Sequence, residues 1–148
     1  LVYRTEPVAD FEAAFRRVQS ADFRPEEVAV VENGPELDGE GHGRIDVVRY
    51  SPNEVILSVR TDAPALLVLS DVYYPGWHAR VDGQSTPIFR TNVTFRGVVV
   101  PPGEHIVSMR FLPRTFQVGA TLAVLTIALL CFTPLRRLLR LLILRPGR

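Results

Sequence analysis

Residues 70–105 read SDVYYPGWHARVDGQSTPIFRTNVTFRGVVVPPGEH, and the turn signals in this stretch decide the fold class. Two Pro-Gly pairs, Pro75-Gly76 and Pro102-Gly103, mark turns. Proline presets φ and the glycine after it accepts a positive φ. Asp82-Gly83 is a strong signal for a tight hairpin. Between these turns apolar and polar residues alternate, which is typical of strands with one buried face. The stretch therefore predicts a series of antiparallel strands.

The segments on either side continue the strand pattern. Residues 45–50 and 54–60 alternate in polarity around a turn of hairpin length. Residues 65–69 form a continuous apolar run that suits a strand buried on both faces, and residues 105–112 alternate again. Together these patterns predict about eight strands, at the spacing typical of β-sandwiches. The sequence predicts a mainly β fold, an antiparallel β-sandwich with its core at 45–112.

The first 44 residues predict a separate N-terminal part, 1–44. Asp10 is a suitable N-cap, and apolar residues at helical spacing follow it, so we expect a short amphipathic helix. These residues are Phe11, Ala14, Phe15 and Val18. A short strand at 28–31 and a glycine-rich, acidic loop at 32–44 come next. The acids and the histidine of this loop match no metal-ligand spacing, so we predict no metal site there.

A long uncharged segment follows the predicted sandwich. Residues 116–132 carry no charge, and a helix continued to residue 135 would be about 30 Å long, enough to cross a bilayer. We therefore predict a transmembrane helix at 116–135; the alternative is a buried helix of a soluble protein. Gly119 and Ala123, one turn apart, favour packing against other transmembrane helices. The predicted partners are the lipid bilayer and such helices.

The charge distribution is uneven. Residues 1–115 contain 12 arginines and all 16 acids, whereas the tail 136–148 contains five arginines and no acid. Because positive residues mark the cytoplasmic side, the tail is predicted to be cytoplasmic and the β domain extracytoplasmic. The acidic balance of the folded part argues against nucleic acid as a partner. The chain begins at Leu1 without a methionine, so we expect it to be part of a longer polypeptide.

No catalytic arrangement is evident in the sequence. The three histidines lack zinc-ligand spacing, and nucleophile elbows and phosphate-binding glycine loops are absent. Cys131 is the only cysteine, which excludes an intrachain disulfide and a cysteine-based metal site. Asp71 and Asp82 lie near predicted turns, but capping explains both better than paired acid catalysis does. We therefore assign no catalytic residue, no metal and no cofactor to these residues.

The aromatic residues beside the Pro75-Gly76 turn are the best candidates for ligand contact. Aromatic rings can stack on sugars, anchor a domain at a membrane interface or fill a core. Trp77 is in phase with the strand that follows it, which favours the core, and adjacent tyrosines of one strand cannot both point inward. Asn92 begins an Asn-Val-Thr glycosylation pattern or is a turn asparagine. The candidate ligand-binding set is Tyr73, Tyr74, Trp77, Asn92 and Arg96.

These motifs resemble a known family over about residues 45–130. The sequence blocks that carry the resemblance are SDVYYPGW at 70–77, VDG at 81–83, Asn92, FRGV at 95–98, VPPGEH at 100–105 and the Pro113 to Gly119 entry into a helix. In this order they are similar to the C-terminal end of YfhO-type bacterial membrane proteins, which implies a location at the bacterial cytoplasmic membrane. Family members often have a lysine or another polar residue where this chain has His78, and an aromatic residue where it has Phe111.

The resemblance implies a function for the parent protein. YfhO-type proteins are large multi-pass proteins similar to GT-C glycosyltransferases, which use lipid-linked sugars on the outer side of the cytoplasmic membrane. Their catalytic acids lie in an N-terminal membrane portion outside this sequence, so none is transferred here. We expect a non-catalytic extracytoplasmic accessory domain with the last membrane span, orienting a glycan or lipid-linked sugar. The alternative is a structural or protein-interaction sandwich anchored in the membrane.

Overall fold

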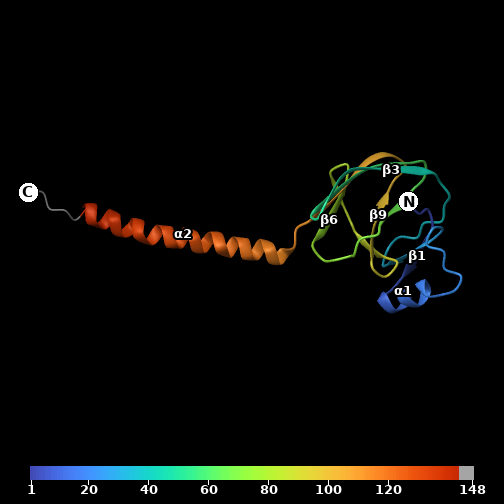
Figure 1. The fold of residues 1–148 in the computed structure, drawn as a ribbon, viewed down its shortest axis with the longest axis horizontal. Coiled ribbons are helices and arrows are strands. Elements are labelled where there is room, and N and C mark those ends of the chain that lie inside the picture. Colours follow the sequence, from blue (N-terminus) through green and yellow to red (C-terminus); the bar gives the residue numbers. More distant parts are fainter. Residues whose placement is uncertain (144–148) are drawn as a thin grey trace, which may run out of the picture. The chain divides into compact units, whose positions relative to one another are not determined.

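The computed structural model describes residues 1–143, with side chains up to residue 130. The chain forms two compact units, Leu1–Leu112 and Pro113–Arg148 (Figure 1). The first unit holds all the strands and one short helix, and the second consists of a single long helix within the described range. All candidate ligand-binding residues lie in the first unit.

Within residues 1–143, ten strands form two five-stranded sheets. The first sheet contains, in spatial order, β1 (Thr5–Val8), β2 (Ala29–Glu32), β8 (Phe89–Thr91), β9 (Phe95–Val100) and β5 (Ala65–Leu69). The second contains β3 (Gly43–Ser51), β4 (Glu54–Thr61), β10 (Gly103–Phe111), β6 (Trp77–Val81) and β7 (Gln84–Thr86). The predicted mainly β fold with two sheets is confirmed. The strands number ten rather than eight, and β1 and β2 run parallel, so the fold is not purely antiparallel.

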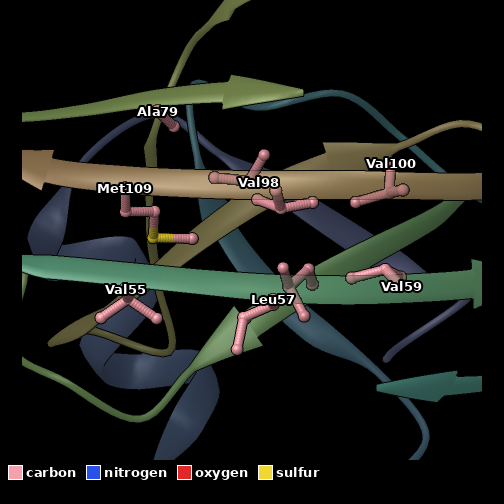
Figure 2. Packing of buried hydrophobic residues seen from close by; sticks show 9 residues of the cluster. Val55, Leu57, Val59, Ala79, Val98, Val100 and Met109 are labelled. Atoms are coloured by element: carbon pink, nitrogen blue, oxygen red, sulfur yellow. The ribbon is translucent and has the colours of Figure 1, made fainter. Parts of the chain in front are cut away.

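The core lies between the two sheets and follows from strand alternation. In β4, Val55, Leu57 and Val59 are buried and alternate with more exposed residues. Figure 2 shows these three side chains beside Met109 of β10 and Val98 of β9. The other side of the first sheet is apolar as well, because Ala29, Val31 and Leu66 form a second buried cluster with Val2.

The N-terminal residues complete the first sheet. Asp10 caps α1 (Phe11–Val18), accepting a hydrogen bond from the backbone N–H of Ala13 at 2.9 Å, so the predicted short helix is confirmed. The helix connects β1 to its parallel partner β2, and β2 joins β8 through the pair Val31 and Thr91. The sequence pattern indicated β2 but not β1. Together they add two strands to the sheet that covers the core.

The second unit corrects the prediction of a transmembrane helix at 116–135. Its helix, α2, runs from Arg114 to Ile143. Among the described residues, no helix combines the length and the apolar character needed to cross a membrane. The prediction was wrong because it counted absence of charge, whereas uncharged polar residues such as Gln117, Thr121 and Thr126 interrupt the apolar run. The arginine tail predicted at 136–148 falls on residues whose side chains lie outside the described part.

Candidate functional site

Arg96 is a buried cation at one end of the core. It precedes the buried residues Val98 and Val100 by two and four positions on β9, so strand periodicity turns it into the space between the sheets. Its side chain is 2% exposed. Its Nη2 donates a hydrogen bond to Oδ2 of Asp71 at 2.7 Å, and its Nε and Nη1 have no hydrogen-bond partner within the described residues. Burial lowers the pKa of the Arg96 guanidinium, and the neighbouring Asp71 carboxylate opposes that shift.

The ring of Trp77 covers this guanidinium. The Arg96 Cζ atom lies 3.8 Å from the ring centroid, which is a cation–π contact. This contact joins β9 of the first sheet to β6 of the second. Trp77 also packs, partly buried, against the main hydrophobic core, as its phase with Ala79 indicates. The indole therefore takes the place of water on one face of the buried charge.

Asp71 joins the two sheets at this end of the sandwich. It follows β5 of the first sheet, and its Oδ2 accepts a second hydrogen bond, at 2.6 Å, from the hydroxyl of Tyr50 on β3 of the second sheet. This hydrogen bond to a carboxylate raises the pKa of Tyr50. The Asp71 side chain remains 37% exposed. Asp71 is thus a carboxylate fixed by two donors and still reachable from solvent.

Two further aromatic rings extend the cluster toward solvent. Phe111, at the end of β10, lies 5.4 Å from Trp77 and 6.1 Å from Tyr74 between ring centroids. Tyr74 is 60% exposed. We call the group of Tyr50, Asp71, Tyr74, Trp77, Arg96 and Phe111 the aromatic end cluster.

The other two candidate residues have structural partners elsewhere. Tyr73 is half-buried beneath the guanidinium of Arg90, at 5.0 Å, and its backbone N–H donates to the carbonyl of Thr94. Asn92 has a left-handed φ of 47°. Its Oδ1 accepts from the Val30 N–H at 2.8 Å, and its own N–H donates to the Val30 carbonyl. Asn92 therefore fastens the turn between β8 and β9 to β2.

The structure brings together three of the five predicted residues, Tyr74, Trp77 and Arg96, through Phe111 and Asp71. Sequence reasoning missed Tyr50, Asp71 and Phe111 as members of the site. One signal was present: an arginine in phase with buried valines on a strand requires a nearby anion. Which acid supplies that anion depends on packing between strands distant in sequence.

A cleft of about 600 Å³ lies at the opposite end of the second sheet, next to the start of β10. Charged side chains line it, and they pair with one another. Arg60 lies 3.3 Å from Glu104, and His42 lies 3.7 Å from Asp62. The described residues contain no group of three or more metal-ligating side chains. This cleft offers neither aromatic faces nor unpaired cations to a ligand, and we leave it outside the candidate site.

Comparison with known proteins identifies the family. The family model described as "Bacterial membrane protein YfhO" matches residues 38–123, more than half of the chain. The matched range runs from β3 through β10 into α2 and includes every member of the aromatic end cluster. No curated protein and no solved structure matches. The chain belongs to the YfhO family of bacterial membrane proteins.

Proposed function

We propose that the first unit is a non-catalytic accessory domain that holds or orients a glycan or lipid-linked sugar for a glycosyltransferase-like membrane protein. The resemblance of YfhO-type proteins to GT-C enzymes supports an extracytoplasmic position, where such sugars are used. The observation that carries the proposal is that the exposed ring of Tyr74 belongs to the same cluster as the fixed carboxylate of Asp71.

The chemistry of the cluster suits a saccharide. The apolar face of a sugar ring can pack on an aromatic ring, while the sugar hydroxyls need hydrogen-bond acceptors. Tyr74 and Tyr50 are 60% and 58% exposed, and Asp71 is an acceptor held in place by Tyr50 and Arg96. A contact residue that is already fixed loses little conformational entropy on binding. Arg96 and Trp77 are positioning residues, since they lie behind the exposed members.

A binding experiment on the full chain tests this proposal. The protein is purified in detergent and applied to an array of bacterial surface oligosaccharides, and dissociation constants are measured for those retained. We expect Tyr74→Ala to weaken binding about tenfold, as removal of a stacked aromatic anchor does. Phe15→Ala is the matched control, because Phe15 is an exposed aromatic residue on α1, outside the cluster. The proposal is overturned if Tyr74→Ala binds the saccharide as tightly as the wild type does. It is also overturned if the protein binds no saccharide on the array.

One observation favours the alternative, a structural or protein-interaction sandwich. Val47 and Val48 on β3 and Val72 after β5 are 63%, 62% and 69% exposed. Exposed apolar side chains such as the adjacent Val47 and Val48 often mark a protein interface. A chain that binds no saccharide but associates through β3 fits this second function.

A further inference from the structure

β3 is an edge strand with side chains exposed along almost its whole length. It is the outermost strand of the second sheet, paired with β4 on one side. Eight of its nine residues are exposed. The backbone groups along the other side of an edge strand are available to a further strand. A strand of this length and apolar content is therefore suited to pairing with another chain.

A bulge in β3 determines which residues share a face. Val47 lies opposite Leu57 and Arg49 lies opposite Ile56, so Val48 is an extra residue between them. In a regular strand, Asp46 and Arg49 would point to opposite faces because they are three residues apart. The inserted residue shifts this alternation by one position.

The shift puts Asp46 and Arg49 on one face of β3 and Ile45, Val47 and Tyr50 on the other. Ile45, Val47 and Tyr50 lie opposite Val59, Leu57 and Val55, which are buried. They are therefore on the core-facing side of the sheet, as directly opposed residues of an antiparallel pair share a face. Asp46 and Arg49 lie opposite Ser58 and Ile56, on the outer side. Their side chains are 56% and 64% exposed.

This arrangement makes the strand complementary to itself. Read outward from the point between Val47 and Val48, the strand shows an apolar, a charged and an apolar residue in each direction, and the two charges have opposite signs. In an antiparallel pair of two copies centred there, each Asp46 lies opposite the other copy's Arg49. Each Ile45 then lies opposite a Tyr50 on the core-facing side. A two-fold axis relates the copies, as in most homodimers.

We propose that β3 pairs with β3 of a second copy of this chain, in the register that opposes Asp46 to Arg49. The continuous sheet then extends across ten strands, and the exposed apolar residues of β3 are covered by their equivalents. Opposite charges placed directly across two strands attract, and like charges in those positions repel. A shift of the register by one residue would oppose charged to apolar side chains, so the charges also select the register. The inference does not depend on saccharide binding.

Charge reversal on the full chain tests the pairing. The protein is purified in detergent, and its dimerisation constant is measured by sedimentation equilibrium. Asp46→Arg places arginine opposite arginine in two symmetric pairs, and Arg49→Asp places acid opposite acid. Each single variant should weaken dimerisation roughly tenfold or more, since two attractions become two repulsions. The double variant D46R/R49D restores opposite signs and should restore the dimer.

The double variant also separates dimerisation from damage within one chain. Within one copy, Asp46 pairs with Arg44 at 2.8 Å, and Arg49 pairs with Glu54 at 3.1 Å. Reversing both charges disturbs both of these pairs, so a fault in folding would be worse in the double variant than in either single one. Arg80→Asp, on the exposed face of β6, is the matched control and should leave dimerisation unchanged. Circular dichroism checks that all variants retain the β fold.

The outcomes decide the proposal. Loss of the dimer in both single variants with recovery in the double variant supports pairing through β3. A chain that is monomeric at all concentrations overturns it, as does a dimer that tolerates either single reversal. A dimer that the double variant fails to recover also overturns the proposed register.

Discussion

The Arg96 guanidinium carbon lies 3.8 Å from the centroid of the Trp77 ring, at the end of the inter-sheet core. Arg96 comes from the first sheet and Trp77 from the second. A cation–π contact in a desolvated site contributes up to about 2 kcal/mol. Asp71 supplies the counter-charge at the solvent side. The stability of this end of the sandwich therefore depends on three residues that act together.

Removing Asp71 should destabilise the first unit more than removing the whole ion pair. Asp71→Ala leaves Arg96 buried without a counter-ion. We expect it to reduce the free energy of unfolding by roughly 2–3 kcal/mol, below the range for fully buried pairs because Asp71 is partly exposed. The double variant D71A/R96M should recover most of the loss. Urea denaturation followed by Trp77 fluorescence measures both. A double variant less stable than Asp71→Ala contradicts this account.

A methyl group added at Gly97 should strain the first sheet. Gly97 is buried on β9, and a Cβ there would overlap the Thr91 hydroxyl and lie 3.1 Å from Cδ1 of Leu66. We expect Gly97→Ala to cost about 1–3 kcal/mol of unfolding free energy. Gly119→Ala, in open space on α2, is the matched control and should not destabilise the chain. Thermal unfolding followed by circular dichroism tests the difference between the two variants.

Asn92 should be needed for both its side chain and its backbone conformation. Asn92→Ala loses the hydrogen bond to the Val30 N–H and places alanine at a left-handed φ. The expected loss is about 1–3 kcal/mol, since a buried donor is left unpaired. Asn92→Gly tolerates the φ but also lacks the side-chain acceptor. Its melting temperature should therefore lie between those of the wild type and Asn92→Ala. Equal melting temperatures for Asn92→Ala and Asn92→Gly would show that the left-handed φ at this position does not affect stability.

The pair of His105 and Asp82 should make stability depend on pH. His105 Nδ1 lies 2.6 Å from Asp82 Oδ2, and this hydrogen bond is the main cause that raises the pKa of His105 above its ordinary value of 6.5. The same contact lowers the pKa of Asp82 from 3.8. The contribution of His105 is complete below pH 6.5 and is lost as pH rises through its raised pKa. That of Asp82 is complete above pH 3.8 and is lost as pH falls through its lowered pKa.

Asp82→Asn isolates this pH effect, because asparagine also accepts the left-handed φ of 50° at this position. The difference in melting temperature between wild type and variant should be greatest between pH 3.8 and 6.5. It should shrink as the pH is raised further toward alkaline values. A difference that stays constant from acid to alkaline pH would show that the charge on His105 does not contribute.

The sequence predicted the elements whose signals are local. The alternation of residues 54–60 and the Asp82-Gly83 turn indicated strands that the structure contains, because burial on one face imposes period two. β1 escaped prediction because its four residues, Thr5–Val8, carry no clear alternation and pair in parallel. The contact of Tyr50 with Asp71 also escaped prediction, since no local pattern specifies which distant strands meet.

The parallel pairing of β1 with β2 has a consequence for the boundary of the domain. The family match begins at residue 38, after both strands, yet Ala29 and Val31 of β2 form a buried cluster with Val2 and Leu66. A fragment cut at residue 38 would therefore leave β8 as an open edge and uncover apolar side chains of the first sheet. It would be prone to aggregate. The cooperative folding unit is thus larger than the stretch by which the family is recognised.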